Sequence, residues 1–350
     1  MGDFYTLAVS SVAPLTPNAV ALTFNVPDTL KEKFNFIAGQ YITVKKTLNG
    51  SEIRRAYSIS SSPSSGKLTI GIKKIQNGIF STYANESIKV GDVLEVMPPE
   101  GRFMFQPHLK AKTIGAFAAG SGITPIISIA QTVMESHDTN RFVLVYGNQS
   151  PEESMYREDL FRLQKKYTNR FFIQWVYSRS NEPDCLFGRI ENATVNLVLK
   201  NKFKEFNFDA FYLCGPEQMI TTVSDTLENN SIPKEHIHFE LFTSSKTILG
   251  GLEGQEGGHS KLSVVLDDDE HQFMMDQKEL VLDALLKNDI DAPYSCYGGV
   301  CSSCIARVVE GKAEMIKNQI LTDSEINEGY ILTCQALPTT PFLKIDFDDV

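Results

Sequence analysis

Four cysteines near the C-terminus constrain this chain more than any other feature. Cys296, Cys301 and Cys304 lie within nine residues, and Cys334 follows after 29 intervening residues. The N-terminus lacks the basic region that opens a secretory signal, and no apolar run approaches the roughly 18 residues needed to cross a bilayer. We therefore expect a cytoplasmic protein, and in that reducing compartment cysteines rarely form disulfides. The four thiols are better interpreted as ligands of a metal centre.

The spacing narrows the kind of centre. Cys-x4-Cys-x2-Cys with a distant fourth cysteine is the pattern in which four thiolates hold a [2Fe–2S] cluster. Gly298 and Gly299 allow a tight loop that turns its backbone N–H groups toward anionic sulfur. A zinc site, usually built from Cys-x2-Cys pairs, and free thiols in a core are the alternatives. Cys185 and Cys214 lie outside the pattern and are not candidate ligands.

The sequence around these cysteines resembles that of plant-type ferredoxins. Three stretches carry the resemblance: Pro293–Cys304, Val308–Gly311 and Leu332–Gln335. It extends over residues 262–348 and implies a β-grasp fold for this part of the chain.

Charge divides the chain in the same place. Residues 1–258 carry 26 basic and 26 acidic side chains, whereas residues 259–350 carry 7 and 17, so the formal net charge of −10 lies in the C-terminal part. Such a field repels nucleic acid and anionic lipid and favours docking on a basic protein surface. We therefore expect a protein partner and neither nucleic-acid nor membrane binding.

A length of 350 residues allows two or three domains, and the pattern of apolar runs predicts three. Residues 1–106 hold short β-branched runs separated by turn residues, which predicts an antiparallel β-barrel. Residues 107–242 alternate buried strands with amphipathic helices, which predicts a parallel α/β sheet. Residues 243–260 are a Gly-rich linker, and the acidic domain is 261–350. The expected strands are 20–26, 41–45, 56–59, 67–72, 93–97, 113–119, 142–147, 171–176 and 210–214, and the expected helices are 126–136, 156–167 and 218–229.

The barrel carries a candidate flavin site. In Arg55-Ala56-Tyr57-Ser58, an aromatic face can cover a flavin ring, a guanidinium can pair with a diphosphate and a hydroxyl can bond a ring nitrogen. Together with Gly78–Thr82 and Pro99–Phe103, this motif resembles the FAD domain of the ferredoxin-NADP reductase superfamily. The alternative is a plain barrel. The resemblance assigns Arg55 to the pyrophosphate, Tyr57 and Ser58 to the isoalloxazine, Ser81 and Thr82 to the phosphates, and Ile72, Lys73 and Gly78 to the same cofactor.

The second domain carries a candidate nucleotide loop, Gly120-Ser121-Gly122-Ile123-Thr124-Pro125, between a buried strand and a helix. Glycines there let the backbone approach a diphosphate, which a helix N-terminus attracts. Alone the loop is a weak signal, because Pro125 replaces the last glycine of the dinucleotide fingerprint. In the same superfamily this form binds the nicotinamide nucleotide. The resemblance places Gly120, Gly122, Thr124 and Pro125 on the nucleotide, Cys214, Gly215 and Pro216 beside the nicotinamide, and Ser178 and Arg179 at the 2′-phosphate of NADPH.

Alternatives remain for these residues. Without its neighbours, Cys214 would be interpreted as a buried thiol at the end of a strand. A single arginine such as Arg179 is usually a solvated surface cation, so the sequence favours NADPH as the donor but leaves NADH open. Glu240 and Phe242 match a Glu-x-Phe that relatives place near the flavin. The resemblance thus implies a catalytic group of Ser58, Thr124, Cys214 and Glu240.

The order of barrel, nucleotide domain, linker and ferredoxin resembles the reductase components of oxygenases. Val281–Leu285 and Gly311–Met315 add a similarity to the reductase subunits of phenylacetyl-CoA epoxidase (ring-oxygenase) complexes. This implies an oxidoreductase of aromatic (phenylacetate) catabolism that passes electrons from NAD(P)H through FAD and a [2Fe–2S] cluster to an oxygenase partner. That partner would be a multisubunit di-iron oxygenase docking on the acidic domain. Alternatives are Rieske oxygenases, desaturases or hybrid-cluster proteins as acceptors, a self-contained NAD(P)H oxidase or redox sensor, and a zinc-stabilised binding module.

Overall fold

The computed structural model describes residues 3–107, 110, 112–242 and 258–350. It divides into two compact units, residues 4–242 and a second unit built mainly from residues 258–350. The predicted linker lies largely outside the described residues. Strand β13 (His259–Leu266) begins two residues before the predicted boundary at 261. None of the described helices is long and apolar enough to span a membrane.

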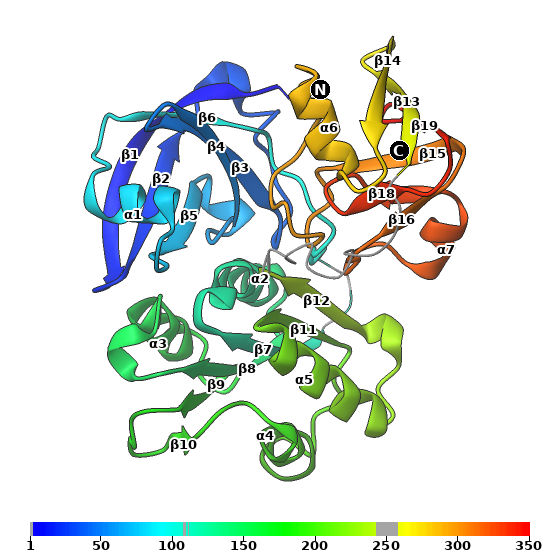
Figure 1. Cartoon of the computed structure of the whole chain (residues 1–350). Helices are drawn as coiled ribbons and strands as arrows, with labels where there is room; N and C mark the ends of the chain where they lie inside the picture. The colour runs from blue at the N-terminus through cyan, green and yellow to red at the C-terminus, as the bar shows by residue number, and fades with distance from the viewer. Residues whose placement is uncertain (1–2, 108–109, 111, 243–257) are drawn as a thin grey trace. The chain divides into compact units, whose positions relative to one another are not determined.

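Within residues 3–107 the strands form one antiparallel sheet, as predicted. Its order is β4-β3-β6-β1-β2-β5, and an antiparallel bridge between Ile59 and Ile70 joins the two edge strands, which closes the sheet on itself (Figure 1). Helix α1 (Ile79–Glu86) packs against β5. The strands are β1 (Tyr5–Thr16), β2 (Ala19–Asn25), β3 (Tyr41–Leu48), β4 (Ser51–Ser58), β5 (Leu68–Lys73) and β6 (Val93–Val96).

Three strands of this barrel differ from the sequence prediction. The segment 5–16 was not predicted as a separate strand, because its second half is largely exposed and lacks a clean alternation of apolar and polar residues. Strands β3 and β4 are longer than expected and join at Asn49-Gly50, both of which have positive φ, 52° and 78°. That backbone is the tight hairpin turn for which Asn-Gly is the preferred pair.

The second domain is a parallel sheet in the order β10-β9-β8-β7-β11-β12. Its strands β7 (Thr113–Ala119), β8 (Arg141–Asn148), β9 (Phe171–Tyr177) and β11 (Ala210–Gly215) match the predicted apolar runs. Chain order reverses between β7 and β11, which creates the crevice at which such sheets bind ligands. The remaining elements are β10 (Leu186–Phe187), β12 (Ile237–Leu241), α2 (Ile123–Ser136), α3 (Arg157–Lys166), α4 (Asn192–Asn196) and α5 (Glu217–Asn229).

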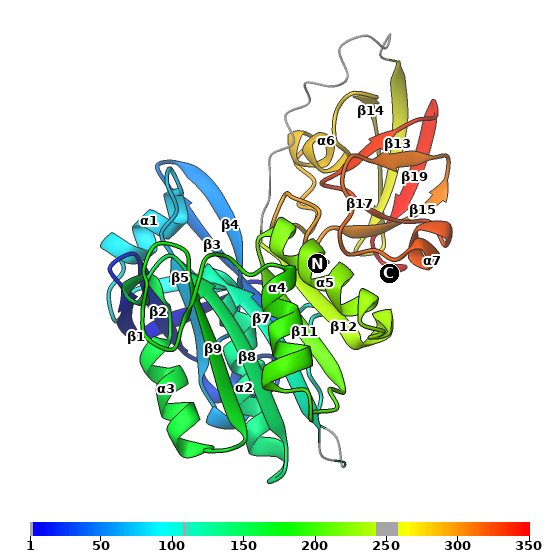
Figure 2. The same ribbon diagram turned by 90° about the horizontal axis from the view of Figure 1, so that it is seen from below.

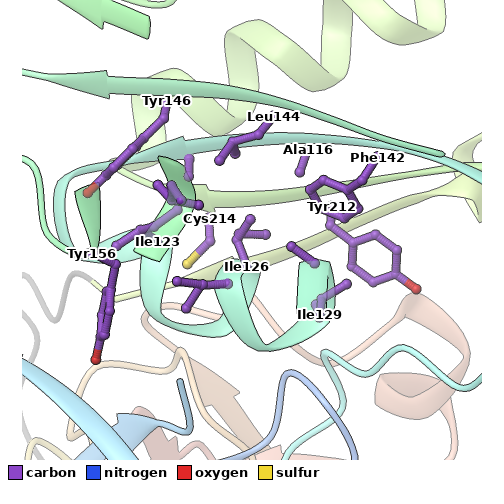
Figure 3. Close-up of a cluster of buried hydrophobic side chains, with 14 of the residues drawn as sticks. Ala116, Ile123, Ile126, Ile129, Phe142, Leu144, Tyr146, Tyr156, Tyr212 and Cys214 are labelled. Carbon is purple, nitrogen blue, oxygen red and sulfur yellow. The ribbon is translucent and has the colours of Figure 1, made fainter. Parts of the chain in front are cut away.

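Helix α2 anchors the core of this domain. Its apolar positions Ile123, Ile126 and Ile129 recur at intervals of three and pack on one face of the sheet, with Leu144 and Tyr212 among their neighbours (Figure 3). Helix α5 packs on the opposite face, so both faces are covered (Figures 1 and 2). This explains why the strands are continuous apolar runs.

The acidic unit contains a mixed sheet in the order β14-β13-β19-β15-β17, in which β13 and β19 are parallel. Helix α6 (Val281–Lys287) contributes Val281, Leu282 and Leu285 to the same core as β13 and β19. This confirms the predicted fold class for the third domain. The other elements are β14 (Asp269–Asp276), β15 (Ile305–Glu310), β16 (Ala313–Met315), α7 (Asp323–Asn327), β17 (Tyr330–Leu332), β18 (Ala336–Pro338) and β19 (Phe342–Asp346).

Two glycines of the barrel offer a matched test of its packing. Gly39 and Gly66 both have positive φ, but a Cβ on Gly39 would lie 2.0 Å from the backbone oxygen of Phe103, whereas a Cβ on Gly66 would meet nothing within 4 Å. We predict that Gly66→Ala costs about 1 kcal/mol of unfolding free energy, and Gly39→Ala about 2 kcal/mol more. The free energy of unfolding of each variant is measured by urea denaturation, monitored through the fluorescence of Trp175, the single tryptophan of the chain. Equal costs would contradict the predicted clash.

Candidate functional site

The barrel and the parallel sheet meet where β4 and β12 end. Ser58, the last residue of β4, donates a hydrogen bond of 3.0 Å from Oγ to Oε2 of Glu240 on β12. Glu240 in turn lies opposite Cys214 in the parallel register of β11 and β12. Three residues from distant parts of the chain are therefore gathered at one point of the domain contact.

A ring of contacts closes around this point. A Cβ on Gly122 would lie 2.1 Å from the backbone oxygen of Cys214, so the nucleotide loop touches β11 directly. On the other side, a Cβ on Gly71 of β5 would lie 2.9 Å from Cγ2 of Thr124. The neighbouring bridge between Ile70 and Ile59 leads back to Ser58. All four predicted catalytic residues, Ser58, Thr124, Cys214 and Glu240, thus lie on one ring.

Burial governs the titration of this group. Removal from water raises the pKa of Glu240 from its ordinary value of 4.5 to about 8, and the hydrogen bond from Ser58 opposes the shift. Burial, followed by the neighbouring Glu240, raises the pKa of the Cys214 thiol well above its usual range. Cys214 is fully buried, so it is a neutral thiol packed beside the site and not a nucleophile.

The nucleotide loop offers an uncapped helix end. Gly120 has φ 57°, and a Cβ there would meet nothing within 4 Å, whereas Gly122 has no room for one. Helix α2 starts at Ile123 with no side-chain cap, and the amide of Ile123 donates to the Gly120 and Ser121 carbonyls of the loop. The positive end of the helix dipole at this loop favours an anion. The Thr124 hydroxyl donates to the Ser121 carbonyl at 3.0 Å and fixes the loop from inside. Pro125 is buried in the first turn of α2, a position that tolerates proline.

Other predicted nucleotide residues lie at the carboxyl edge of the same sheet. Asn148 and Tyr177 are paired at the ends of β8 and β9, and Ser178 and Arg179 follow directly after Tyr177. The amide of Arg179 donates to the Gln149 carbonyl at 2.9 Å, and its side chain is exposed.

Two further residues line this edge at the end of β11. Gly215 leaves little space, since a Cβ there would lie 3.2 Å from Cβ of Ala119. Pro216 follows it and is the residue that immediately precedes helix α5. The structure therefore brings Gly215 and Pro216 to the same sheet edge as Ser178 and Arg179.

The predicted flavin residues gather around α1. Tyr57 packs its ring 5.7 Å from that of Phe80, and burial raises the pKa of its hydroxyl. The hydroxyl of Ser81 donates to the Gly78 carbonyl at 3.2 Å, and a Cβ on Gly78 would lie 2.3 Å from the Ser81 hydroxyl oxygen. Helix α1 also begins without a side-chain cap. A flat aromatic face beside an uncapped helix end fits a cofactor with a ring system and a diphosphate.

The remaining residues predicted to bind the flavin differ in exposure and in the contacts that they make. Arg55 is exposed, and its Nη1 donates to the carbonyl of Arg54 at 2.6 Å. Lys73 forms an ion pair of 3.5 Å with Glu153 of the second domain, so it contributes to the domain contact as well. Ile72 is fully buried, Thr82 is half-buried in the first turn of α1, and Phe242 is 37% exposed after the end of β12.

In the acidic unit the four predicted ligands lie together. The thiol of Cys296 is hydrogen-bonded to those of Cys301 and Cys334, and Cys334 also bonds Cys304. Cys301, Cys304 and Cys334 are buried. The backbone amide of Gly298 donates to Cys296 Sγ at 3.3 Å. Hydrogen bonds from the thiols of Cys301 and Cys334, together with backbone amides, lower the pKa of Cys296. The same hydrogen bonds with Cys296 raise the pKa values of Cys301 and Cys334. Four converging thiols with amide donors fit a thiolate-bound cluster.

Side chains outside the cysteine pattern hold this loop in shape. Tyr297, directly after the first cysteine, has φ 58°, and its carbonyl accepts from Nε2 of Gln335 at 3.0 Å. Its hydroxyl is hydrogen-bonded to Asp283 of α6. Both the amide and the hydroxyl of Thr333 donate to the Cys304 carbonyl at 3.0 Å. From the sequence, Tyr297, Thr333 and Gln335 belonged only to the ferredoxin-like stretches and had no role of their own.

A run of serines was also missed as a site. Ser60, Ser61 and Ser64 follow the flavin motif, which ends at the predicted site residue Ser58, and they look like an ordinary turn in the sequence. In the structure each is hydrogen-bonded to the second domain. The contacts are Ser58 to Glu240, Ser60 to Tyr156, the Ser61 carbonyl to Ser128, and Ser64 to Glu135. Repeated small hydroxyl residues directly after a binding motif were the available signal.

Comparison with family models assigns each part of the chain to a domain type. The oxidoreductase FAD-binding domain matches residues 6–105, the oxidoreductase NAD-binding domain matches 117–225, and the 2Fe-2S iron-sulfur cluster binding domain matches 264–339. With the folds and sites above, they define an electron-transfer flavoprotein that binds FAD, a nicotinamide nucleotide and a [2Fe–2S] cluster.

Curated relatives specify the family further. The chain is 35% identical to a subunit of 1,2-phenylacetyl-CoA epoxidase from Escherichia coli K12, covering 99% of each chain. It is 32% identical to the ferredoxin reductase component of 3-ketosteroid-9-alpha-monooxygenase from Rhodococcus rhodochrous, over 97% of this chain and 96% of that one. The chain therefore belongs to the family of reductase components of oxygenase systems. It is an oxidoreductase that passes electrons from NAD(P)H through FAD and the cluster to an oxygenase.

Solved structures share the same arrangement of folds. Phthalate dioxygenase reductase matches with a TM-score of 0.62 at 23% identity, covering 98% of both chains. An intact type IV self-sufficient cytochrome P450 monooxygenase matches with a TM-score of 0.72 at 21% identity, over 99% of this chain and 42% of its own. These likenesses show the fold alone.

The raised pKa of Glu240 predicts a pH dependence of stability. In the unfolded chain the carboxyl ionises near 4.5, whereas the folded protein keeps the proton up to about pH 8. Between these values the folded state binds more protons, so the free energy of unfolding falls as pH rises. Glu240→Gln should remove this fall in the free energy of unfolding, because glutamine does not titrate. In thermal unfolding between pH 5 and 8.5, the stability of the variant relative to wild type should therefore increase as pH rises. Exposed Glu235→Gln is the control, and parallel curves would contradict the prediction.

Proposed function

We propose that this reductase delivers electrons to a multisubunit di-iron oxygenase that acts on phenylacetyl-CoA. One observation carries the proposal, namely the 35% identity with the epoxidase subunit over 99% of both chains. The 32% identity with the ferredoxin reductase component of the steroid monooxygenase supports a steroid monooxygenase as the second candidate acceptor. Delivery of electrons from NADPH to the purified oxygenase components of each system, measured by product formation, separates the two.

Hydride transfer is assigned to the ring of contacts around Ser58. Bound FAD accepts an electron pair as hydride and releases the electrons singly, which no side chain can do. Ser58 and Thr124 set the approach of nucleotide and flavin, and Cys214 packs beside them as a neutral thiol. At neutral pH the Glu240 carboxyl holds its proton, so its hydrogen bond with Ser58 joins two uncharged groups. A neutral pair does not repel the arriving hydride.

The FAD and nucleotide assignments follow the placement of the two uncapped helix ends. Tyr57 covers the flavin ring, and the start of α1 with Arg55 takes the diphosphate. The start of α2 takes the nicotinamide diphosphate. Ser178 and Arg179 take a 2′-phosphate, which makes NADPH the proposed donor. The further members of these two sites are Ile72, Lys73, Gly78, Ser81, Thr82 and Phe242 for FAD, and Gly120, Gly122, Pro125, Gly215 and Pro216 for the nucleotide.

The four clustered thiols, Cys296, Cys301, Cys304 and Cys334, are the proposed cluster ligands. We predict that Cys301→Ser removes the iron–sulfur absorbance and electron delivery to the oxygenase, while NADPH still bleaches the flavin at close to the wild-type rate. Cys185→Ser, which changes a half-buried cysteine of the other unit, should leave both spectra unchanged. The measurement is anaerobic absorbance before and after one equivalent of NADPH, repeated with NADH. An intact cluster in Cys301→Ser would exclude that ligand.

The acidic unit is the proposed docking surface. The turn between β13 and β14 exposes Asp267, Asp268 and Asp269, and the carboxylate of Asp348 accepts from the amides of Asp267 and Asp268 at 3.0 and 2.8 Å. Asp267 and Asp268 in the turn, Asp269 at the start of β14 and Asp348 after β19 thus place four carboxylates at this end of the hairpin. Such a patch speeds encounter with a basic partner surface, and salt screens it.

We predict that the triple substitution Asp267→Asn, Asp268→Asn and Asp269→Asn slows association with the oxygenase about tenfold at low ionic strength and flattens its salt dependence. Cluster reduction by NADPH should stay unchanged. The matched control removes three exposed carboxylates from the other unit, by Glu191→Gln, Glu205→Gln and Glu235→Gln. Stopped-flow oxidation of the reduced cluster by the oxygenase measures both variants. An unchanged rate in the first variant would place docking elsewhere.

A further inference from the structure

One buried hydroxyl links the nucleotide domain to the wall of the barrel. Tyr156, which precedes α3, donates from its hydroxyl to Oγ of Ser60 at 2.7 Å, and the Ser60 hydroxyl donates onward to the Thr69 carbonyl at 3.1 Å. Ser60 follows the bridge of Ile59 that closes the barrel. Burial raises the pKa of the Tyr156 hydroxyl, so it stays protonated and available as a donor.

The same hydroxyl is packed against the strand that faces Thr124. A Cβ on Gly71 of β5 would lie 2.6 Å from the Tyr156 oxygen and 2.9 Å from Cγ2 of Thr124. The bare backbone of this glycine lets both side chains reach β5 at one place. Tyr156 and the helix that begins at the nucleotide loop therefore rest on one point of the barrel.

Tyr156 is also tied to the nucleotide loop through its own domain. The hydroxyl of Tyr146 donates to the carbonyl of Gly120 at 2.9 Å, and it lies 3.4 Å from the carbonyl oxygen of Met155. Figure 3 shows Tyr146 and Tyr156 on the same side of α2, with their hydroxyls pointing away from the core. A continuous path thus runs from the loop glycine to the serine beside the flavin motif.

The backbone at Tyr156 is held in an uncommon conformation. Its φ is 58°, in the left-handed region that bulky residues avoid. Such strain persists only where the surroundings enforce it, and it concentrates at functional positions. The nearby Glu153 reinforces the same contact, with its carboxylate 3.3 Å from Nδ2 of Asn18 and 3.5 Å from Nζ of Lys73, both in the barrel.

We propose that Tyr156, through its hydrogen bond to Ser60, is a positioning residue. It sets the distance between the nucleotide loop and the barrel strands that carry the flavin motif during hydride transfer. The proposal rests on the proposed binding of the nucleotide at Gly120–Thr124. A misplacement of about 1 Å can slow a reaction about 100-fold, so one lost contact at this point is expected to affect the rate of transfer and not the affinity.

The test is anaerobic stopped-flow reduction of the full-length holoprotein by NADPH. Tyr156→Phe and Ser60→Ala should each lower the limiting rate of flavin reduction about tenfold, with the apparent Kd for NADPH within about twofold of wild type. The charge-transfer absorbance that reports contact between nucleotide and flavin should weaken in both. The double variant should be no slower than either single variant, because both remove the same bond.

Tyr212→Phe is the matched control. Its hydroxyl also donates from the nucleotide domain to the barrel side, to the Met104 carbonyl at 3.2 Å, but it is not tied to the loop. This variant should keep the wild-type limiting rate. The proposal would be overturned if Ser60→Ala and Tyr156→Phe kept the wild-type rate, or if Tyr212→Phe showed an equal fall. If Tyr156→Phe does not fold, Ser60→Ala alone decides the test. If wild type itself were not reduced by NADPH or NADH, the proposed nucleotide site would be what fails.

Discussion

The hydrogen bonds between one serine-rich segment and the nucleotide domain are the constraint on which the rest of residues 4–242 depends. A flavin on one domain and a nicotinamide on another can react only at contact distance, and neither domain can set that distance alone. Residues 58–64 begin at the end of the flavin motif and provide four hydroxyl or carbonyl contacts to the second domain. Each bond is worth only about 0.5–1.5 kcal/mol, but leaving one of these partners unpaired costs more, which makes the domain orientation specific.

The sequence predicted the parallel sheet well because its strands are buried on both faces. Residues 113–119 and 142–147 are continuous apolar runs, and the structure places strands there. The weaker elements were missed for physical reasons. β12, Ile237–Leu241, carries His238 and Glu240 among its five residues, so its pattern is not that of a buried strand. α4 has five residues and is stabilised by its contacts with α5, which no local pattern reveals.

The candidate site divides in the same way. The residues expected to hold cofactors lie in local motifs. The four cysteines were therefore predicted from their spacing, and Gly120–Pro125 from its resemblance to the nucleotide loop of the superfamily. Residues that act across domains have no such signature. Ser60 and Tyr156 are 96 positions apart, and only the folded chain brings their oxygens to 2.7 Å. Asp283 likewise lies outside the cysteine loop and reaches Tyr297 because α6 packs on the same core.

The two units have separate hydrophobic cores, and this separation has a consequence for how such reductases diversify. The residues proposed to select the electron donor, Ser178 and Arg179, lie in the unit of residues 4–242, and the carboxylates proposed to face an acceptor lie in the other unit. Substitutions in one core leave the packing of the other intact, so their effects on stability are independent. With docking on the acidic unit as proposed, a change of surface charge in residues 258–350 would alter the choice of oxygenase without disturbing the packing that surrounds the proposed hydride-transfer site.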